Sequence, residues 1–318
     1  MARSVGVGWL VALFALVVAL PSSLPAADVS SELAPLAPKS LLLDVTRAGD
    51  RLVAVGDRGH VLLSDDEGRT WKQIVVPTRA MLTGVSFGDA NHGCAVGHDG
   101  MILTTADAGQ TWVQRRRNTE IDTIWLDVHL YDNAHGLAVG AYGKWVTTYD
   151  GGTTWVDVSD RGDESHLNHI DVGADEATYI AGEGGLLLVA RKRDVDWSKA
   201  EVGYEGSLFG TLPLASKRVL TYGLRGHVFA SDDAGKTWAE HELPIAVLIM
   251  AGVQLKSGVV VLAGAGGNFF ISSDDGLTFA HWKPTEYLGG VSALLETRDG
   301  ALLAVGESGV ARLQLPLK

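Results

Sequence analysis

A short glycine motif recurs seven times along the chain at nearly constant spacing. Each copy places a pair of mostly apolar residues before a glycine, followed by two variable residues and a second glycine. The first glycines are Gly56, Gly97, Gly140, Gly182, Gly223, Gly264 and Gly306. They step by 41, 43, 42, 41, 41 and 42 residues. A fixed period of this length indicates stacked supersecondary units that bury a core only against their neighbours.

A second motif lies about eight residues downstream in five of the copies. Its first occurrence reads Ser64-x-Asp66-x-Gly68-x-Thr70-Trp71. Its aspartates are Asp66, Asp107, Asp150, Asp233 and Asp274. The Asp carboxylate accepts hydrogen bonds within its own turn, the glycine supplies a positive φ, and the aromatic residue begins the next strand. This is the Asp-box, or BNR repeat. We interpret the five aspartates as structural groups that stabilise turns, rather than as metal ligands or catalytic acids.

The two motifs together predict an all-β, seven-bladed β-propeller of four-stranded blades. In the first copy the expected strands are Leu41–Thr46, Arg51–Gly56, His60–Ser64 and Trp71–Val76. The last copy supplies three strands before the chain ends at Lys318. We therefore expect the N-terminal segment Val29–Pro38 to pair with Gly309–Leu315 as the outer strand of the last blade, which would remove an exposed edge.

The first 27 residues have the pattern of a signal peptide. Arg3 precedes the uncharged, mostly apolar stretch Val5–Leu20, and Ala26 and Ala27 offer small residues for cleavage. An uncleaved N-terminal anchor is the alternative. The pattern divides the chain into a signal peptide (1–27) and an exported propeller (28–318). The expected location is the periplasm, the thylakoid lumen in a photosynthetic organism, or the exterior, with no membrane span after cleavage.

Charge and cysteine content narrow the classes of partner. The formal net charge is −12, and the leader carries only Arg3, so the remaining chain is near −13 (−12 − 1). An acidic surface repels phosphate backbones, so nucleic acid and a broad anionic membrane surface are unsuited as partners. Cys94 is the single cysteine, which excludes an intrachain disulfide. We expect a monomer without a cofactor or metal.

The variable residues between the paired glycines are candidates for partner binding, because loops on a rigid scaffold commonly carry recognition residues. Arg115, Arg116 and Arg117 form the one dense basic run, and Arg79 occupies a similar loop after the first repeat. The candidate partner-binding residues are Arg58, Arg79, Arg115, Arg116, Arg117, Tyr142 and Arg225. Ordinary turn variation, and a solvated basic run paired with Glu120 and Asp122, remain open as alternatives.

The histidines do not form a metal-binding pattern. His92 and His135 share one repeat position, and His60 and His227 share another. The one close pair is His166-x-x-His169, and in a strand this spacing directs the two rings to opposite faces.

The combined pattern resembles the family of photosystem II stability/assembly factors and their bacterial relatives. The matching features are the Ala-Val-Gly-x-x-Gly turn, the Asp-box and the His-Gly turns at 91–93 and 134–136, and the resemblance covers residues 41–315. It implies an exported seven-bladed propeller that binds a membrane-protein client, as the photosynthetic members escort new reaction-centre protein on the lumenal side. An arginine-rich patch accompanies that role, for which Arg58, Arg79 and Arg115–Arg117 are the candidates here.

Asp-boxes also occur in sialidases and other glycosidases. Those enzymes need an arginine triad, a Tyr–Glu nucleophile pair and an acid Asp. Tyr204-Glu205 and Glu286-Tyr287 are the two Tyr/Glu neighbours, and no nucleophile elbow or phosphate-binding loop is found. We therefore predict a non-catalytic scaffold. A glycosidase and a secreted carbohydrate- or peptide-binding module are the alternatives.

Overall fold

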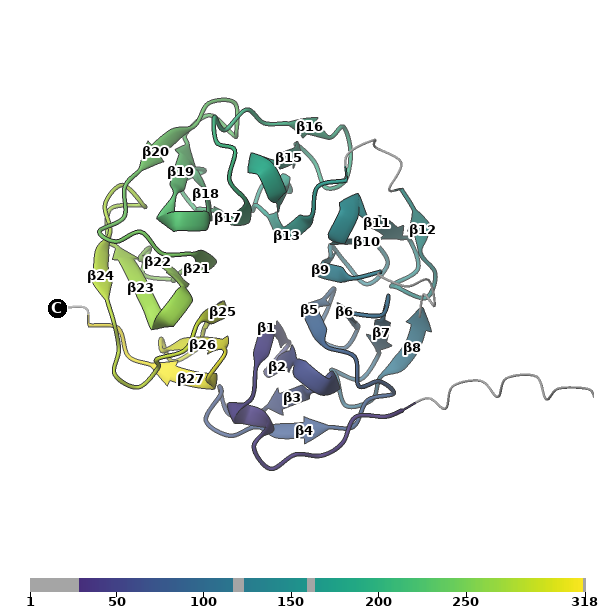
Figure 1. Ribbon diagram of the computed structural model, residues 1–318. Coiled ribbons are helices and arrows are strands. Elements are labelled where there is room, and N and C mark those ends of the chain that lie inside the picture. Colours follow the sequence, from purple (N-terminus) through teal and green to yellow (C-terminus); the bar gives the residue numbers. More distant parts are fainter. Residues whose placement is uncertain (1–28, 117–122, 159–163, 317–318) are drawn as a thin grey trace, which may run out of the picture.

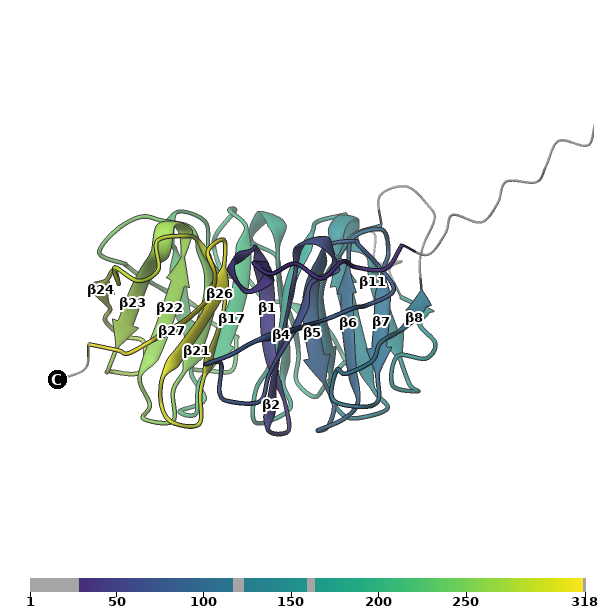
Figure 2. The same ribbon diagram turned by 90° about the horizontal axis from the view of Figure 1, so that it is seen from below.

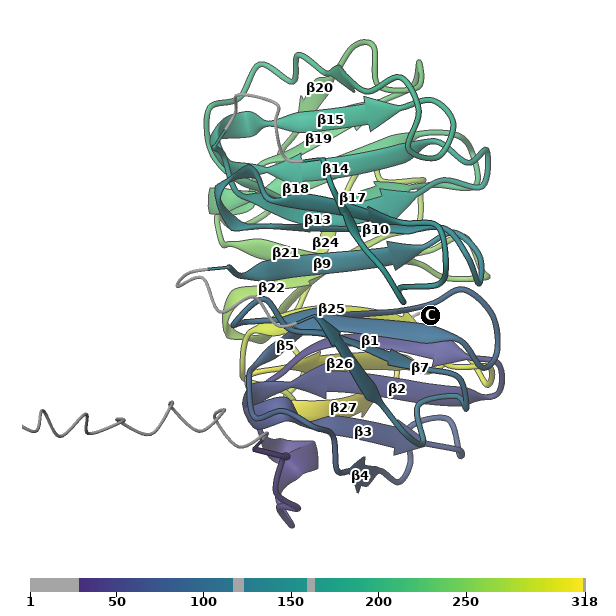
Figure 3. The ribbon, with the colours of Figure 1, turned by 90° about the vertical axis from the view of Figure 1, so that its right-hand side faces the viewer.

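Seven antiparallel sheets surround a central axis in the computed structural model, which describes residues 29–116, 123–158 and 164–316 (Figure 1). The seven-bladed all-β propeller expected from the glycine period is confirmed. The strands lie along the ring axis, so that their connecting loops gather at two faces (Figure 3). In each blade the first strand of the repeat is innermost, because the sheets follow the order of the sequence from the axis outward.

The strands follow one plan in every repeat. Blade 1 contains β1 (Leu42–Ala48), β2 (Arg51–Gly56), β3 (Val61–Ser64) and β4 (Lys72–Ile74). Blade 2 contains β5 (Leu82–Phe87), β6 (Gly93–Gly97), β7 (Ile102–Thr105) and β8 (Val113–Arg116). Blade 3 contains β9 (Trp125–Leu130), β10 (Gly136–Gly140), β11 (Trp145–Thr148) and β12 (Val156–Asp157). Blade 4 contains β13 (Leu167–Val172), β14 (Thr178–Gly182), β15 (Leu187–Ala190) and β16 (Ser198–Lys199).

The second half of the ring repeats the plan until the last blade. Blade 5 contains β17 (Leu208–Pro213), β18 (Val219–Gly223), β19 (Val228–Ser231) and β20 (Ala239–His241). Blade 6 contains β21 (Ile249–Gln254), β22 (Val260–Gly264), β23 (Asn268–Ser272) and β24 (Ala280–Trp282). Blade 7 contains β25 (Val291–Glu296), β26 (Leu302–Gly306) and β27 (Gly309–Leu313). The 3-10 turns are η1 (Ala37–Lys39), η2 (Asp57–Gly59), η3 (Ala141–Gly143), η4 (Glu183–Gly185), η5 (Leu224–Gly226) and η6 (Ala265–Gly267).

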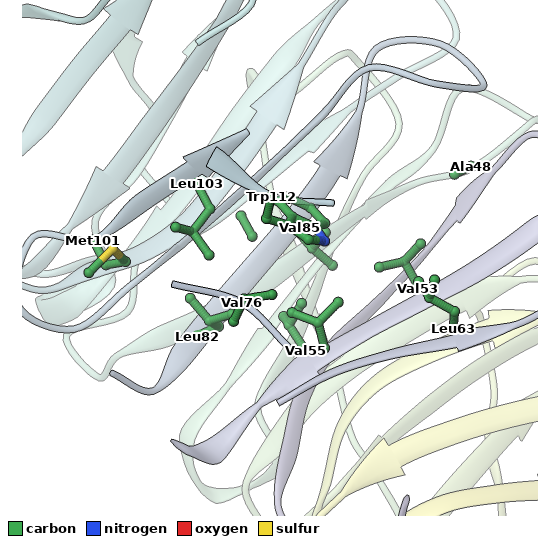
Figure 4. Packing of buried hydrophobic residues seen from close by; sticks show 12 residues of the cluster. Ala48, Val53, Val55, Leu63, Val76, Leu82, Val85, Met101, Leu103 and Trp112 are labelled. Atoms are coloured by element: carbon green, nitrogen blue, oxygen red, sulfur yellow. The ribbon is translucent and has the colours of Figure 1, made fainter. Parts of the chain in front are cut away.

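The core lies between the blades. The described part of the chain contains seven buried hydrophobic clusters, and each draws its residues from two neighbouring blades. At the junction of blades 1 and 2, Val53 and Val55 meet Leu82, Val85 and Leu103 (Figure 4). The apolar residues that precede each glycine motif therefore hold the ring together, since burial of apolar surface is the main source of stability.

The prediction that Val29–Pro38 pairs with Gly309–Leu315 as the fourth strand of the last blade is wrong. Within the described residues, blade 7 has three strands, and residues 29–41 form no strand, only η1. The N-terminal segment runs along the edge of blade 1 instead (Figure 2). The backbone N–H of Ser31 donates to Val76 O at 2.9 Å, and the side chain of Gln73 bonds to the backbone of Glu32 and Ala34. Pro35 and Pro38 lack the N–H groups that a ladder needs.

Blades 1 and 7 are joined by side chains rather than by a shared sheet. Leu42 and Leu52 of blade 1 pack with Leu303 and Val305 of blade 7 in one buried cluster. The carboxylate of Glu67 in blade 1 also accepts the backbone N–H of Arg298 in blade 7, at 2.8 Å. The ring therefore closes by the same kind of packing that joins the other blades.

Candidate partner-binding face and central channel

One face of the ring carries both the Gly-x-x-Gly turns and the connections between blades; we call it the glycine-turn face. The second glycine of each turn lies against the connection that leads into the next blade. The backbone N–H of Gly100 donates to Thr123 O at 2.7 Å, and that of Gly143 donates to Ser165 O at 3.0 Å. A Cβ on Gly59 would lie 2.3 Å from Thr78 O, so no larger residue fits this approach without moving backbone.

Three of the candidate binding residues project from turns on this face. Arg58, Tyr142 and Arg225 each occupy the middle of a 3-10 turn with a left-handed backbone, at φ 54°, 56° and 58°. The Arg58 side chain is 80% exposed and Tyr142 is 57% exposed. The Tyr142 ring packs edge-on against His166, with ring centroids 4.9 Å apart. These three side chains are presented by blades 1, 3 and 5 and do not form one contiguous sector.

Some of the candidates for an arginine-rich patch already have partners within the protein. Arg79 forms an ion pair with Glu32 and donates to Ser30 O, so it holds the N-terminal segment. Arg58 lies 3.4 Å from the carboxylate of its neighbour Asp57. Arg115 is exposed on β8, and its Nε donates to Thr104 Oγ1 at 2.8 Å. Arg116 ends β8, and its side chain is not described.

Arg117, and the residues Glu120 and Asp122 that were considered as its partners, lie outside the described residues. The leader, residues 1–27, lies outside them too. Within the described residues, the backbone of Arg79 lies against Gly59, next to Arg58 in the sequence, while Arg115 lies on the outer strand of the next blade.

The opposite face carries the five aspartate turns. Asp66 Oδ1 accepts the backbone N–H of Thr70 at 2.8 Å, and Oδ2 accepts the Thr70 hydroxyl at 2.6 Å. The bonds from the Thr70 hydroxyl and backbone lower the pKa of Asp66 to about 2. The same pair of bonds forms at Asp107, Asp150, Asp233 and Asp274. Both oxygens of all five carboxylates therefore accept hydrogen bonds from their own turns.

A cavity of about 460 Å³ lies in the central channel at its glycine-turn end. Its lining comes from the first residues of the inner strands, together with Met81 and His98 from that face. One wall carries Asp44 of β1, Asp127 of β9, and His169 and Asp171 of β13. The other wall is apolar, with Phe209, Met250 and Leu294 from β17, β21 and β25. The cavity thus has an ionic side and an apolar side.

The ionic wall is an ordered network that links blades. His169 Nδ1 lies 2.6 Å from Asp127 Oδ2, and His169 Nε2 lies 3.4 Å from Asp171 Oδ2. Each carboxylate also accepts a backbone N–H from the next blade. The donors are Val85 to Asp44, Ile170 to Asp127 and Thr211 to Asp171, at 2.8, 2.8 and 3.1 Å. These bonds explain why polar side chains are tolerated on inner strands.

The network shifts the pKa values of its members. Burial alone would lower the pKa of His169, but Asp127 and Asp171 raise it to about 10. Burial, followed by repulsion from Asp127, raises the pKa of Asp44. Burial raises the pKa of Asp171 as well. Burial lowers the pKa of the neighbouring His129 to about 4, so that ring is neutral at pH 7.

The sequence reasoning did not identify this channel network, and considered His169 only as half of a pair with His166. A signal exists. Asp44, Asp127 and His169 occupy the same position of the repeat, two residues after the buried Leu42, Trp125 and Leu167. Across 29–116, 123–158 and 164–316, no group of three or more His, Cys, Asp or Glu residues is arranged to hold a metal ion.

The two Tyr/Glu neighbours considered for catalysis have engaged hydroxyls. Tyr204 Oη donates to Leu224 O at 3.2 Å, and Tyr287 Oη donates to Gly290 O at 3.2 Å. Tyr287 is 1% exposed and belongs to the core between blades 6 and 7.

The part of the chain that the structure describes contains no helix with the length and apolar character of a membrane span.

Comparison with known proteins gives a family match and several shared folds. The family model described as photosynthesis system II assembly factor YCF48 matches residues 63–123 and 116–305, more than half of the 318 residues. No curated protein sequence matches the chain.

Solved structures that share the fold include the following three. A structure of YCF48 bound to D1 peptide is 19% identical, with a TM-score of 0.72 over 87% of this chain and 94% of that one. YCF48 from Cyanidioschyzon merolae is 17% identical, with a TM-score of 0.71 over 87% and 96%. The WD40 β-propeller domain of Doa1 is 12% identical, with a TM-score of 0.68 over 92% and 97%.

Proposed function

Because the chain belongs to the photosynthesis system II assembly factor YCF48 family, we propose that it is a non-catalytic scaffold that binds a segment of a membrane-protein client and assists its assembly. The observation that carries this proposal is the family match, which spans blades 2 to 6 completely and parts of blades 1 and 7. One of the structures with the same fold is that of YCF48 bound to D1 peptide, so a peptide is the bound partner of that protein. A client segment is the corresponding partner for this chain.

The glycine-turn face is the proposed binding surface. It presents Arg58, Tyr142 and Arg225 on short turns whose backbone is held by the blades, and it opens onto the channel cavity. The aspartates of the other face accept hydrogen bonds on both oxygens from the backbone and hydroxyl groups of their own turns. A rigid scaffold that offers variable side chains is suited to recognition, because little conformational entropy is lost on binding.

The scaffold is proposed to act outside the cytoplasm, with residues 1–27 as the signal peptide and 28–318 as the exported propeller. The periplasm is the expected compartment, or the thylakoid lumen in a photosynthetic organism. A non-catalytic role is supported by the engagement of Tyr204 and Tyr287, whose hydroxyls both donate to backbone carbonyls. A sialidase nucleophile needs a tyrosine that is free to attack the substrate.

Charge reversal on matched sites tests the proposal. Arg225 and Lys236 are both exposed on blade 5 and lie on opposite faces, in η5 and in the Asp233 turn. We expect Arg225→Glu combined with Arg58→Glu to reduce the capture of membrane-protein clients from extracts of the source organism. Lys236→Glu should leave the capture unchanged. Equal capture by all three proteins would overturn the assignment of the face, and capture of no membrane protein by the wild type would overturn the function.

A further inference from the structure

The channel cavity has two chemically different walls at the centre of the proposed binding face. Its ionic wall comes from blades 1, 3 and 4, and its apolar wall comes from blades 5, 6 and 7. Met250 on the apolar wall is 36% exposed, which is high for a large apolar side chain. The volume of about 460 Å³ lies within the usual range for sites that hold a small group. A ligand that fits both walls must be part charged and part apolar.

Carboxyl groups outnumber cationic groups on the ionic wall. Asp44, Asp127 and Asp171 face one charged imidazole, that of His169. Both nitrogens of that ring are taken by Asp127 and Asp171, so Asp44 has no ion-pair partner among the residues that the structure describes. Asp44 accepts the backbone N–H groups of Val45 and Val85, one on each oxygen, and each oxygen retains a free lone pair. Asp44 is half-buried, and the one opposing charge that acts on it, that of His169, is shared with Asp127 and Asp171, so a further cation would be favourable there.

None of the cavity-lining residues from blades 5, 6 and 7 is charged. The wall opposite Asp44 can therefore contact an alkyl chain but cannot neutralise the carboxylate. A group that brings its own positive charge on an apolar stem would satisfy both walls at once. Lysine and arginine side chains have this form, because an apolar stem of three or four methylene groups carries the charged head.

We propose that the channel cavity binds a basic side chain of the client segment, with its charged head at Asp44 and its stem against Phe209 and Met250. This inference rests on the proposed function, and it names the chemistry that the client must present. The cation compensates the excess negative charge of the wall, and the cavity removes the stem from water. Exposed turn residues such as Arg58 and Tyr142 then contact the flanking parts of the segment.

The raised pKa of Asp44 agrees with this assignment. Burial and the repulsion from Asp127 make the charged form of Asp44 unfavourable while the cavity is empty. A bound cation favours the charged form, so binding displaces a proton from Asp44 when the carboxyl is protonated. The affinity for a basic side chain should therefore increase as the pH rises through the titration of Asp44. The titratable side chains that line the cavity together with Asp44 are His98, Asp127, His169, Asp171 and Tyr222. Of these, Asp127 raises the pKa of Asp44 and His169 lowers it.

Two blocked tripeptides provide the test, acetyl-Gly-Lys-Gly-amide and acetyl-Gly-norleucine-Gly-amide, titrated by calorimetry and by NMR of the His169 ring. Norleucine keeps the four-carbon stem and lacks the charge. We expect the lysine peptide to bind and the norleucine peptide to show no binding. Asp44→Asn should weaken the lysine peptide at least tenfold. Asp99→Asn, the same change on an exposed turn of the same face, should leave it unchanged.

Met250→Lys provides a second variant that leaves the network of hydrogen bonds in place. Its side chain should occupy the cavity and abolish binding of the lysine peptide, whereas Met250→Leu should not. Equal affinity of wild type and Asp44→Asn, or equal binding of both peptides, would overturn the inference. If Met250→Lys loses peptide binding but still captures the client, the cavity does not bind the client and the inference is overturned. If client capture is at the same time lost in the Arg58 and Arg225 reversals, the proposed binding face still holds.

Discussion

Gly309 lies against the carbonyl oxygen of Pro38, so closely that a Cβ on Gly309 would be 2.1 Å from that oxygen. Gly59 stands in the same relation to Thr78, at 2.3 Å. The N-terminal segment therefore occupies the place of a connection between blades 7 and 1, although it adds no strand. The ring is closed by one repeated glycine contact and by the buried cluster around Leu42 and Leu303.

Substitution of Gly309 tests this closure. Gly309→Ala introduces a Cβ at φ +76° and forces the Pro38 backbone to move. The left-handed backbone alone should cost about 1–3 kcal/mol in the free energy of unfolding, and the clash adds to it. Gly300→Ala is the control, because Gly300 has φ +79° in the same blade and has no atom within 4 Å of the Cβ position. Equal losses in urea unfolding would show that the Pro38 contact contributes nothing.

Asp107 should contribute to stability rather than to binding. Asp107→Ala removes the acceptor of the Thr111 backbone N–H and hydroxyl. We expect the free energy of unfolding to fall by about 1–3 kcal/mol, because these donors lose their partner. Glu242→Ala, which removes an exposed carboxylate elsewhere, should have little effect. An unchanged unfolding midpoint together with lost client binding would mean that Asp107 belongs to a binding site.

The aspartate turns could be predicted from the sequence, whereas the route of the N-terminal segment could not. The glycine period and the spacing of Asp66, Gly68 and Thr70 are local patterns, so the number of blades and the aspartate turns follow from them. The route of Val29–Pro38 depends on which distant edge offers Ser31 a partner, and periodicity does not encode that choice. The channel network was missed because Asp44 and Asp127 are 83 residues apart (127 − 44) and Asp127 and His169 are 42 apart (169 − 127), and they line one cavity only in the folded ring.

The channel network should make stability depend on alkaline pH. The pKa of His169 rises from 6.5 to about 10 through Asp127 and Asp171, which outweigh burial. Because the pKa of His169 is higher in the folded than in the unfolded protein, its charged form stabilises the fold. This contribution is complete below pH 6.5 and is lost as the pH rises to about 10. Thermal unfolding temperatures between pH 7 and pH 10 should therefore fall more steeply for the wild type than for His169→Gln. Parallel curves for the two proteins would contradict the charged state assigned to His169.

The proposed scaffold should not hydrolyse glycosides. Tyr204 and Tyr287 both donate their hydroxyls to backbone carbonyls. Burial raises the pKa of both phenols, so both stay protonated and weakly nucleophilic at neutral pH. We expect no turnover of sialosides or common aryl glycosides above the rate of a heat-inactivated sample. Turnover that disappears in Tyr204→Phe or Tyr287→Phe would replace the scaffold by the glycosidase alternative.

Site-specific photo-cross-linking tests the central claim most directly. Tyr142 and Tyr149 are 57% and 62% exposed and belong to blade 3, Tyr142 in η3 on the glycine-turn face and Tyr149 beside Asp150 on the other. A photoreactive phenylalanine derivative replaces each in turn, and the cross-linked partners from the source organism are identified by mass spectrometry. We predict a membrane-protein client cross-linked from position 142 and none from position 149. A client cross-linked from position 149 alone would contradict the proposed binding face.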